Sequence, residues 1–364
     1  MQTVKNTIQF VIDSKIVEID FNKSTYKPTT TILNYLRSLP NHKGVKEGCA
    51  EGDCGACTVV LGELQDGKLA YKAVDSCLVF LPMIHGKQLI TVENVGTSDN
   101  LHPVQQAMVD TDGSQCGYCT PGFIMSLFEL YKNHNNPSRE TIVDSLTGNL
   151  CRCTGYKSII EAAATLYVHQ GKDHFDSQEP MVVKLLSAIP NESISIITDK
   201  PACVETSAGR QKYFRPVTLR EALKLKSEYP GANILCGATD LALRVTKNKE
   251  LLYELIDISG VKELQQIHEN TKTVSFGSSA SLEDIKSISE KKFPALYNML
   301  VVFGSKQIRH LATLGGNLGA ASPIGDMIPV LMAYGATIVV ESVAGKRKIP
   351  SINFITGYRK TQRK

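Results

Sequence analysis

The chain has 364 residues, of which 42% are apolar and 21% charged, and its formal net charge is +4. This length suggests two or three domains, and the dispersed basic residues argue against a nucleic-acid-binding protein. No apolar signal segment follows Met1, and no run of about 18 apolar residues occurs, so we expect no membrane span and a cytoplasmic location.

The first segment is predicted to be a small α+β domain over residues 1–87. Strand-like residues 8–12 and 16–19 surround a short turn, and an apolar-faced helix over 30–39 ends at Pro40. A glycine-rich cysteine loop follows at 44–57, and another strand begins directly after it.

Eight of the ten cysteines lie before residue 154. In a reducing compartment, clustered cysteines are more often metal or catalytic ligands than disulfides. The first four follow a C-x4-C-x2-C pattern with a distant fourth cysteine, which is the spacing of plant-type [2Fe–2S] sites. The glycines between them let the loop wrap tightly and turn N–H groups toward sulfur, whereas zinc loops usually use closer pairs. The sequence therefore favours a [2Fe–2S] cluster on Cys49, Cys54, Cys57 and Cys77.

Residues 88–166 are predicted to form a four-helix bundle, with helices that start at 102–103, at Pro121, at 137–140 and at Tyr156. A C-x2-C pair and a C-x-C pair precede two of these helices, where free N–H groups and the helix dipole stabilise negative charge. By spacing alone, a second cluster, a zinc site and a thioredoxin-like pair at Cys116 and Cys119 remain open. The cysteines of this second group are Cys116, Cys119, Cys151 and Cys153.

Residues 167–212 are weakly periodic and are interpreted as a surface linker. From residue 213 the pattern is mixed α/β, and a strand there runs into a Gly/Thr turn at 234–241 whose N–H groups could cradle a pyrophosphate. No G-x-G-x-x-G motif occurs, so a Rossmann fold is not supported, and tight turns in a packed domain explain the glycines equally well. Cys203 and Cys236 stand alone and are interpreted as small buried apolar residues.

The two cysteine regions resemble the iron–sulfur domains of the molybdenum hydroxylases, and among them those of the xanthine dehydrogenases. The resemblance rests on residues 48–57 with Cys77, on 101–106, on 115–122 and on 148–156. It implies a β-grasp, plant-type ferredoxin domain followed by a four-helix [2Fe–2S] domain, with clusters on both cysteine groups. It also implies that Gln115 and Cys153 lie beside the pterin of a molybdenum cofactor, which a large partner subunit holds in a heterotetramer.

Residues 213–364 resemble the FAD-binding domain of the same family, an α+β domain that is not of the Rossmann type. His310 stands where bacterial members usually have Asn, and we interpret it as a surface or hydrogen-bonded histidine. Residues 354–361 look like the entry into a further subdomain, which we expect to be missing, so FAD binding would be weakened or another chain would complete the pocket. The residues that the resemblance assigns to FAD are Ile234, Leu235, Cys236, Gly237, Ala238, Thr239, Asp240, Leu241, Phe303, Thr313, Asn317 and Asp326.

The resemblance predicts an oxidoreductase component that transfers electrons and has no substrate-binding residues of its own. Electrons from purine oxidation on the partner would pass through both clusters to FAD and then to NAD. Two alternatives remain open: the same component of an enzyme acting on aldehydes, carbon monoxide or heterocycles, and a truncated iron–sulfur protein that takes up no flavin.

Overall fold

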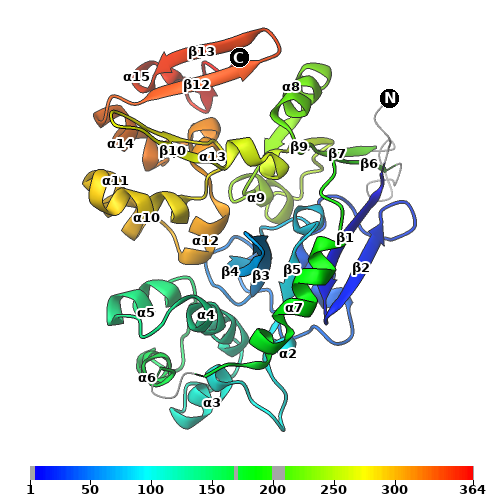
Figure 1. Ribbon diagram of the computed structural model, residues 1–364, viewed down its shortest axis with the longest axis vertical. Helices are drawn as coiled ribbons and strands as arrows, with labels where there is room; N and C mark the ends of the chain where they lie inside the picture. The colour runs from blue at the N-terminus through cyan, green and yellow to red at the C-terminus, as the bar shows by residue number, and fades with distance from the viewer. Residues whose placement is uncertain (1–4, 168–170, 199–209, 364) are drawn as a thin grey trace.

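The computed structural model describes residues 5–167, 171–198 and 210–363. They form three packed parts, with a sheet in the middle, a helical layer on one side and a larger α+β part on the other (Figure 1). This order confirms the predicted multidomain α+β fold. Within the described ranges, no helix is both long and apolar enough to cross a bilayer.

The first part is a five-stranded sheet in the order β2-β1-β5-β3-β4, packed against one helix. Its elements are β1 (Thr7–Ile12), β2 (Lys15–Asp20), α1 (Ile32–Ser38), β3 (Thr58–Gln65), β4 (Lys68–Asp75) and β5 (Gln88–Ile90). Thr31 caps α1 by accepting a hydrogen bond from the N–H of Asn34. Because β5 lies between β1 and β3, the sheet extends past residue 87, where the sequence placed the domain boundary.

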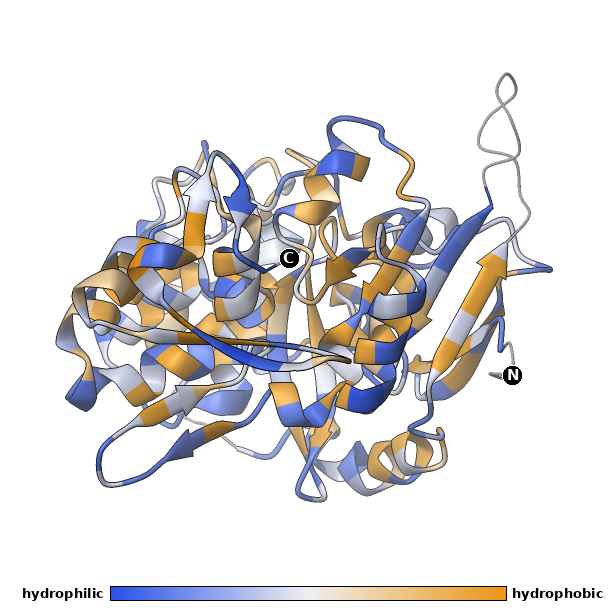
Figure 2. Ribbon diagram, turned by 90° about the horizontal axis from the view of Figure 1, so that it is seen from above, coloured by the Kyte–Doolittle hydropathy of each residue, from blue (hydrophilic) through white to orange (hydrophobic). Residues whose placement is uncertain are grey.

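The second part contains the four predicted helices. Its elements are α2 (Val92–Val95), α3 (Pro103–Asp110), α4 (Thr120–Asn133), α5 (Arg139–Leu146) and α6 (Lys157–Thr165). The central helix is α4, whose Phe123, Leu127 and Leu130 have no exposed surface. Several strands alternate apolar and polar residues, and several helices carry an apolar stripe along one side (Figure 2).

The segment 167–212 differs from the predicted linker, because it contains α7 (His174–Ser187) and β6 (Ile194–Thr198). Asp173 caps α7, and Phe175, Val182 and Leu186 are its buried residues, but Pro180 interrupts the helical pattern in the sequence. β6 joins the sheet of the third part. Tertiary packing therefore orders α7 and β6, and Cys203 lies outside the described residues.

The third part has a four-stranded sheet in the order β6-β7-β9-β8, in which β7, β9 and β8 are parallel. A layer of short helices and hairpins follows it and ends in an exposed two-stranded hairpin, β12–β13, at the top of Figure 1. The elements are β7 (Gln211–Arg215), α8 (Leu219–Glu228), β8 (Asn233–Leu235), α9 (Leu241–Thr246), β9 (Glu254–Asp257), β10 (Ile267–Glu269), β11 (Val274–Phe276), α10 (Leu282–Lys292), α11 (Pro294–Val302), α12 (Lys306–Leu311), α13 (Leu314–Ala320), α14 (Met327–Ala333), β12 (Thr337–Ser342), β13 (Gly345–Pro350), α15 (Ser351–Phe354), β14 (Ile355–Gly357) and β15 (Lys360–Thr361).

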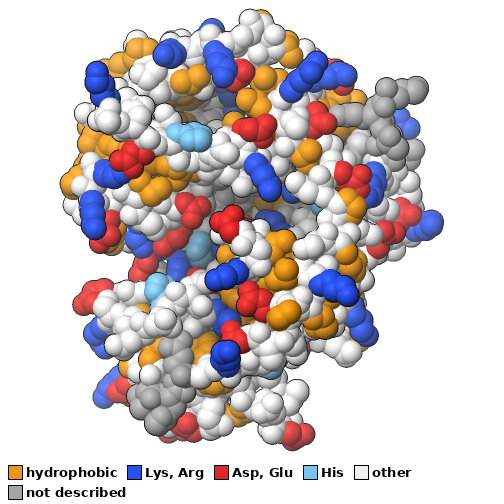
Figure 3. Space-filling view, in the orientation of Figure 1, with side chains coloured by type: hydrophobic (Ala, Val, Ile, Leu, Met, Phe, Trp, Pro, Cys, Tyr) orange, Lys and Arg blue, Asp and Glu red, His pale blue; other side chains and the backbone are white. Residues whose placement is uncertain are grey.

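The short helix α12 joins the third part to the other two. Lys306 pairs with Glu129 of α4 at 2.9 Å, and the side chain of Glu129 is only 1% exposed. His310 Nδ1 hydrogen-bonds to the Ala73 carbonyl of β4 at 2.9 Å, which confirms the expectation of a hydrogen-bonded histidine. Acidic and basic side chains gather where this helical layer meets the second part (Figure 3).

Candidate iron–sulfur and flavin sites

The first cysteine loop lies between α1 and β3 and carries three thiols of its group, while Cys77 follows β4, and the four thiols are arranged in two pairs. Cys49 is hydrogen-bonded to Cys54, and Cys57 to Cys77. The N–H groups of Glu51 and Asp53 also donate to Cys49 Sγ, at 3.4 and 3.3 Å. The hydrogen bond with Cys54 and these N–H groups lower the pKa of Cys49 to about 4, although burial opposes the shift. Cys49 therefore favours the thiolate, the form in which sulfur binds metal, whereas the same hydrogen bond raises the pKa of Cys54.

The second group is also arranged as two pairs, in which Cys116 bonds to Cys153 and Cys119 to Cys151. Cys119 occupies the N-cap position of α4. Cys116 and Cys153 are exposed, whereas the other pair is partly buried. Since Cys116 and Cys119 each bond to a cysteine of the other segment, the arrangement disfavours a thioredoxin-like pair.

This two-and-two arrangement discriminates between the metals that the sequence left open. One zinc ion needs four ligands around a single point. A [2Fe–2S] cluster instead has two irons, each bound by two protein ligands. Both cysteine groups therefore fit a [2Fe–2S] cluster, whose chemistry is the uptake and release of one electron.

The two cysteine loops are in direct contact with each other. The N–H of Leu150 donates to the Cys54 carbonyl at 3.0 Å, and Asn149 Nδ2 donates to the Gly55 carbonyl at 3.1 Å. A Cβ on Gly122 would come within 2.2 Å of that same carbonyl oxygen, so only glycine fits there. The sequence gives no signal for this contact of Asn149, although the residue lies inside the motif 148–156.

The outer face of the first loop contacts the third part of the chain. Lys247, which follows α9, donates to the Cys49 carbonyl at 3.1 Å and pairs with Glu51 at 3.1 Å. Ile308 of α12 approaches Gly52 in the same loop. Nothing in the sequence indicated this contact, because Lys247 and Cys49 are 198 residues apart.

We expect Lys247→Met to lower the reduction potential of the first cluster, because a nearby positive charge favours the added electron. The free energy of unfolding should change by less than about 1 kcal/mol, since the Lys247–Glu51 pair is exposed. A redox titration followed by electron paramagnetic resonance measures the potential. Lys249→Met is the control, since Lys249 donates to the Thr246 carbonyl, outside the cysteine loop. Equal potentials in the two variants would contradict the prediction.

The predicted pyrophosphate loop follows the carboxyl end of β8. Ala238 has a φ of 62°, the left-handed conformation found in turns that direct successive N–H groups toward an anion. A Cβ on Gly237 would lie 1.7 Å from the Leu311 carbonyl oxygen, so the loop packs on the end of α12. Burial raises the pKa of the Cys236 thiol to about 12, and this thiol lies within hydrogen-bond reach of Thr313.

The remaining predicted flavin residues lie on neighbouring elements. Thr313 caps α13 by accepting from the N–H of Gly316. Asn317 Oδ1 is buried and has no hydrogen-bond partner among the described residues, so a flavin N–H or a ribityl hydroxyl group would satisfy it. Phe303 ends α11 and Asp326 precedes α14, and neither makes a hydrogen bond to the loop in the described structure. The site formed by the predicted pyrophosphate loop, Thr313 and Asn317 fits FAD, which supplies two-electron chemistry when bound.

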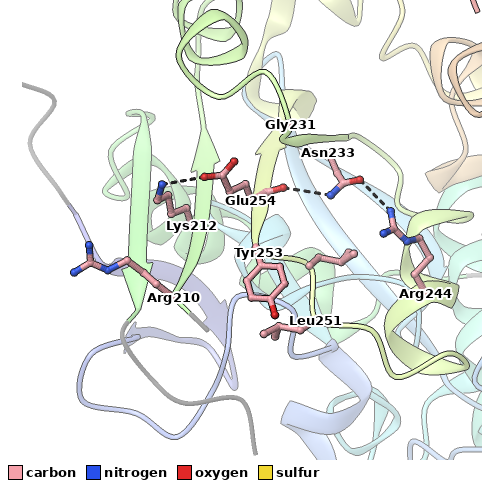
Figure 4. A pocket seen from close by; sticks show the side chains of 9 residues that line it. Arg210, Lys212, Gly231, Asn233, Arg244, Leu251, Tyr253 and Glu254 are labelled. Carbon is pink, nitrogen blue, oxygen red and sulfur yellow. Dashed lines mark hydrogen bonds and ion pairs between the residues drawn. The ribbon is translucent and has the colours of Figure 1, made fainter. Parts of the chain in front are cut away.

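A pocket of about 500 Å³ lies away from this loop, at the amino ends of β7, β8 and β9 (Figure 4). Its basic side chains are already engaged, because Lys212 pairs with Glu254 at 2.9 Å and Arg244 donates to Asn233 at 3.0 Å. No residue assigned to FAD from the sequence lines it.

Family models match three consecutive segments of the chain. The 2Fe-2S iron-sulfur cluster binding domain matches residues 17–81, the [2Fe-2S] binding domain matches 91–164, and the FAD binding domain in molybdopterin dehydrogenase matches 207–364. The domain order predicted from the sequence is therefore confirmed.

Individual proteins are similar along nearly the whole chain. The xanthine dehydrogenase of Drosophila pseudoobscura pseudoobscura is 36% identical and covers 92% of this chain. That of Drosophila subobscura is 34% identical and covers 99%. The chain spans 28% and 30% of the length of these two relatives. Quinoline 2-oxidoreductase from Pseudomonas putida 86 is 26% identical, with 50% of this chain and 95% of the other covered and a TM-score of 0.36. The chain belongs to the molybdenum hydroxylases and forms a xanthine dehydrogenase-like iron–sulfur and FAD part of them.

Proposed function

We propose that this chain carries electrons from a molybdenum–pterin centre on a partner subunit to FAD and then to NAD, during the oxidation of a purine. Bound clusters each take up one electron, and FAD combines two for transfer to NAD. The observation that carries the proposal is the linear order of the sites. The exposed second cysteine group adjoins the first group through Leu150 and Cys54, and the first group faces the FAD-binding part through Lys247.

The exposed side of the second cysteine group is the proposed face toward the molybdenum subunit. Gln115 is exposed there, and Tyr118 and Leu150 are 49% and 54% exposed. A pocket of about 530 Å³ beside Cys116 and Cys119 is lined by apolar side chains, such as Met108 and Ile124, and by polar ones, such as Gln105 and Asp112. Such a patch is typical of a protein interface. We also propose that the chain and this subunit form a heterotetramer. The proposed location is the cytoplasm, because reducing conditions there keep clustered cysteines free.

The chain's own residues hold and tune these groups. The cysteines Cys49, Cys54, Cys57 and Cys77 would hold one cluster, and Cys116, Cys119, Cys151 and Cys153 the other. The N–H groups of Glu51 and Asp53 stabilise negative charge on Cys49. The loop 234–241, with Thr313 and Asn317, would hold the pyrophosphate and flavin of FAD, and the proposed contacts of Phe303 and Asp326 would complete that site.

The test is an absorption spectrum of the anaerobically purified chain, with iron, zinc and flavin measured on the same sample. We expect about four irons and one flavin per chain. Iron without flavin would retain the clusters and refute a complete path to NAD on this chain, whereas zinc without iron would refute the cluster assignments. The rates at which the chain, assembled with its molybdenum subunit, oxidises a purine, an aldehyde, carbon monoxide and an aromatic heterocycle then identify the substrate class.

A further inference from the structure

A glutamine of the FAD-binding part reaches into the junction between the two cysteine loops. Gln307 of α12 has no exposed surface. Its Nε2 donates to Asn149 Oδ1 at 3.0 Å and to Ser126 Oγ at 3.1 Å, both in the helical part. Asn149 Nδ2 in turn donates to the Gly55 carbonyl at 3.1 Å, in the loop of the first cysteine group. Two side-chain amides therefore link all three parts of the chain.

The chemistry of these groups fixes the direction of each hydrogen bond. The Gly55 carbonyl is only an acceptor, so Asn149 must present its NH2 group to it. Asn149 Oδ1 then faces Ser126, whose hydroxyl donates to it at 2.6 Å, and faces Gln307. Gln307 must therefore present its own NH2 group. An ionised glutamate, which has the same size but no donor, would set two acceptors against each other, and a leucine would leave Asn149 Oδ1 without this donor.

The site gives Gln307 little freedom to move. A Cβ on Gly148 would lie 2.2 Å from Gln307 Oε1, so the amide packs directly against the backbone that precedes Asn149. The flanking Lys306 is anchored to the buried Glu129. Gln307 Oε1 is buried without a hydrogen-bond partner among the described residues, an arrangement that costs stability. A polar group kept at such a cost points to a role beyond packing.

We propose that Gln307 is a positioning residue: it fixes the orientation of the Asn149 amide and, through it, the mutual placement of the two loops that hold the clusters. Asn149 immediately precedes Leu150, whose N–H bonds to the Cys54 carbonyl. Docking of the FAD-binding part thereby sets how the two cluster sites are aligned. This inference rests on the proposed function, because it assumes that both cysteine groups hold [2Fe–2S] clusters.

The test compares two buried glutamines in the full chain. Gln307→Leu removes the amide, and Gln307→Glu keeps its shape but leaves no donor when ionised. The matched controls are Gln211→Leu and Gln211→Glu. Gln211 is 2% exposed and also bridges to the first part, since it donates to the Leu252 carbonyl at 2.8 Å and to Thr29 Oγ1 at 3.3 Å. Neither of these contacts involves a cysteine loop.

The first measurement is the electron paramagnetic resonance spectrum of the reduced chain, in which two nearby clusters split each other's signals. We expect the Gln307 variants to change this splitting at unchanged iron content, and the Gln211 variants to leave it as in the wild type. The second measurement is hydrogen exchange, which needs no cluster. Exchange at Leu150 should be about tenfold faster in the Gln307 variants, as for the loss of one net hydrogen bond.

The outcomes separate this inference from the proposed function. A wild-type chain without iron would refute the proposed function, and exchange at Leu150 would still decide the role of Gln307. If both Gln307 variants show the wild-type splitting and the wild-type exchange rate at Leu150, the positioning role of Gln307 is refuted and the proposed function is unaffected. The same changes in all four variants would also refute this role, because they would show general loosening of the interfaces. If Gln307→Leu fails to assemble, the isosteric Gln307→Glu supplies the comparison.

Discussion

Replacement of Gly55 by alanine should destabilise the chain severely and remove its iron. Gly55 has a φ of 66°, and a Cβ there would lie 2.2 Å from the Gly148 carbonyl oxygen and 2.5 Å from Asn149 Nδ2. The first clash is with backbone, which cannot rotate away. The two cysteine loops would have to separate, at a cost of more than about 3 kcal/mol in the free energy of unfolding.

Gly67→Ala is the matched control for this prediction. Gly67 has a φ of 80°, but nothing lies within 4 Å of the added Cβ. Only the backbone strain remains, about 1–2 kcal/mol. Urea unfolding and iron content per chain measure both variants. A similar loss of stability at the two glycines, with iron retained in both, would show that the loops can separate without harm to the sites.

Replacement of Arg309 by methionine should lower the free energy of unfolding by about 3 kcal/mol, because it removes one of the two cations that pair with Asp144 and Glu283 at a buried junction and leaves Lys286 as the other. The Arg309 side chain has no exposed surface. Its Nη2 donates to both carboxylate oxygens of Asp144 at 2.8 Å, its Nε donates to Glu283, and its Nη1 donates to the Phe303 carbonyl. Arg309 therefore connects the predicted flavin-binding part to the helical part, in the region where acidic and basic side chains gather in Figure 3.

The matched control is Arg244→Met, which removes the 2.7 Å pair with Glu250. Both side chains of that pair are 41% exposed, so the loss should stay below about 1 kcal/mol. Chemical unfolding of the two variants at pH 7 makes the comparison. Equal losses in the free energy of unfolding would mean that Lys286, which also pairs with Asp144, stabilises the junction without Arg309.

The effect of Arg309→Met should depend on pH. Burial opposes ionisation of Asp144 and Glu283, but Lys286 and Arg309 outweigh it and hold the pKa of both carboxyls below their usual range. Such carboxylates stabilise the fold above their unfolded pKa, near 4, and lose this contribution as the pH falls through the folded pKa. The difference in the free energy of unfolding between wild type and variant should therefore have its full size at pH 7 and should become smaller below about pH 4. Unfolding curves over this range measure it, and a constant difference would contradict the assignment.

The sequence by itself determined the order of the domains and most of their elements, and it predicted the cysteine ligands. The C-x4-C-x2-C spacing is local, so the chain that carries it must converge on one site wherever the loop is packed. Capped and apolar-faced helices such as α1 and α8 were predictable for the same reason, because their signals lie within a few residues of each other.

Only the tertiary structure decided how these sites are connected. It paired the cysteines two and two, placed β5 inside the first sheet, and ordered α7 and β6 in a segment without a clear pattern. It also brought Lys247 to Cys49 and Gln307 to Asn149, contacts between residues 198 and 158 positions apart. Contacts over such distances arise from the packing of separate domains, and one chain's local pattern carries no signal for them.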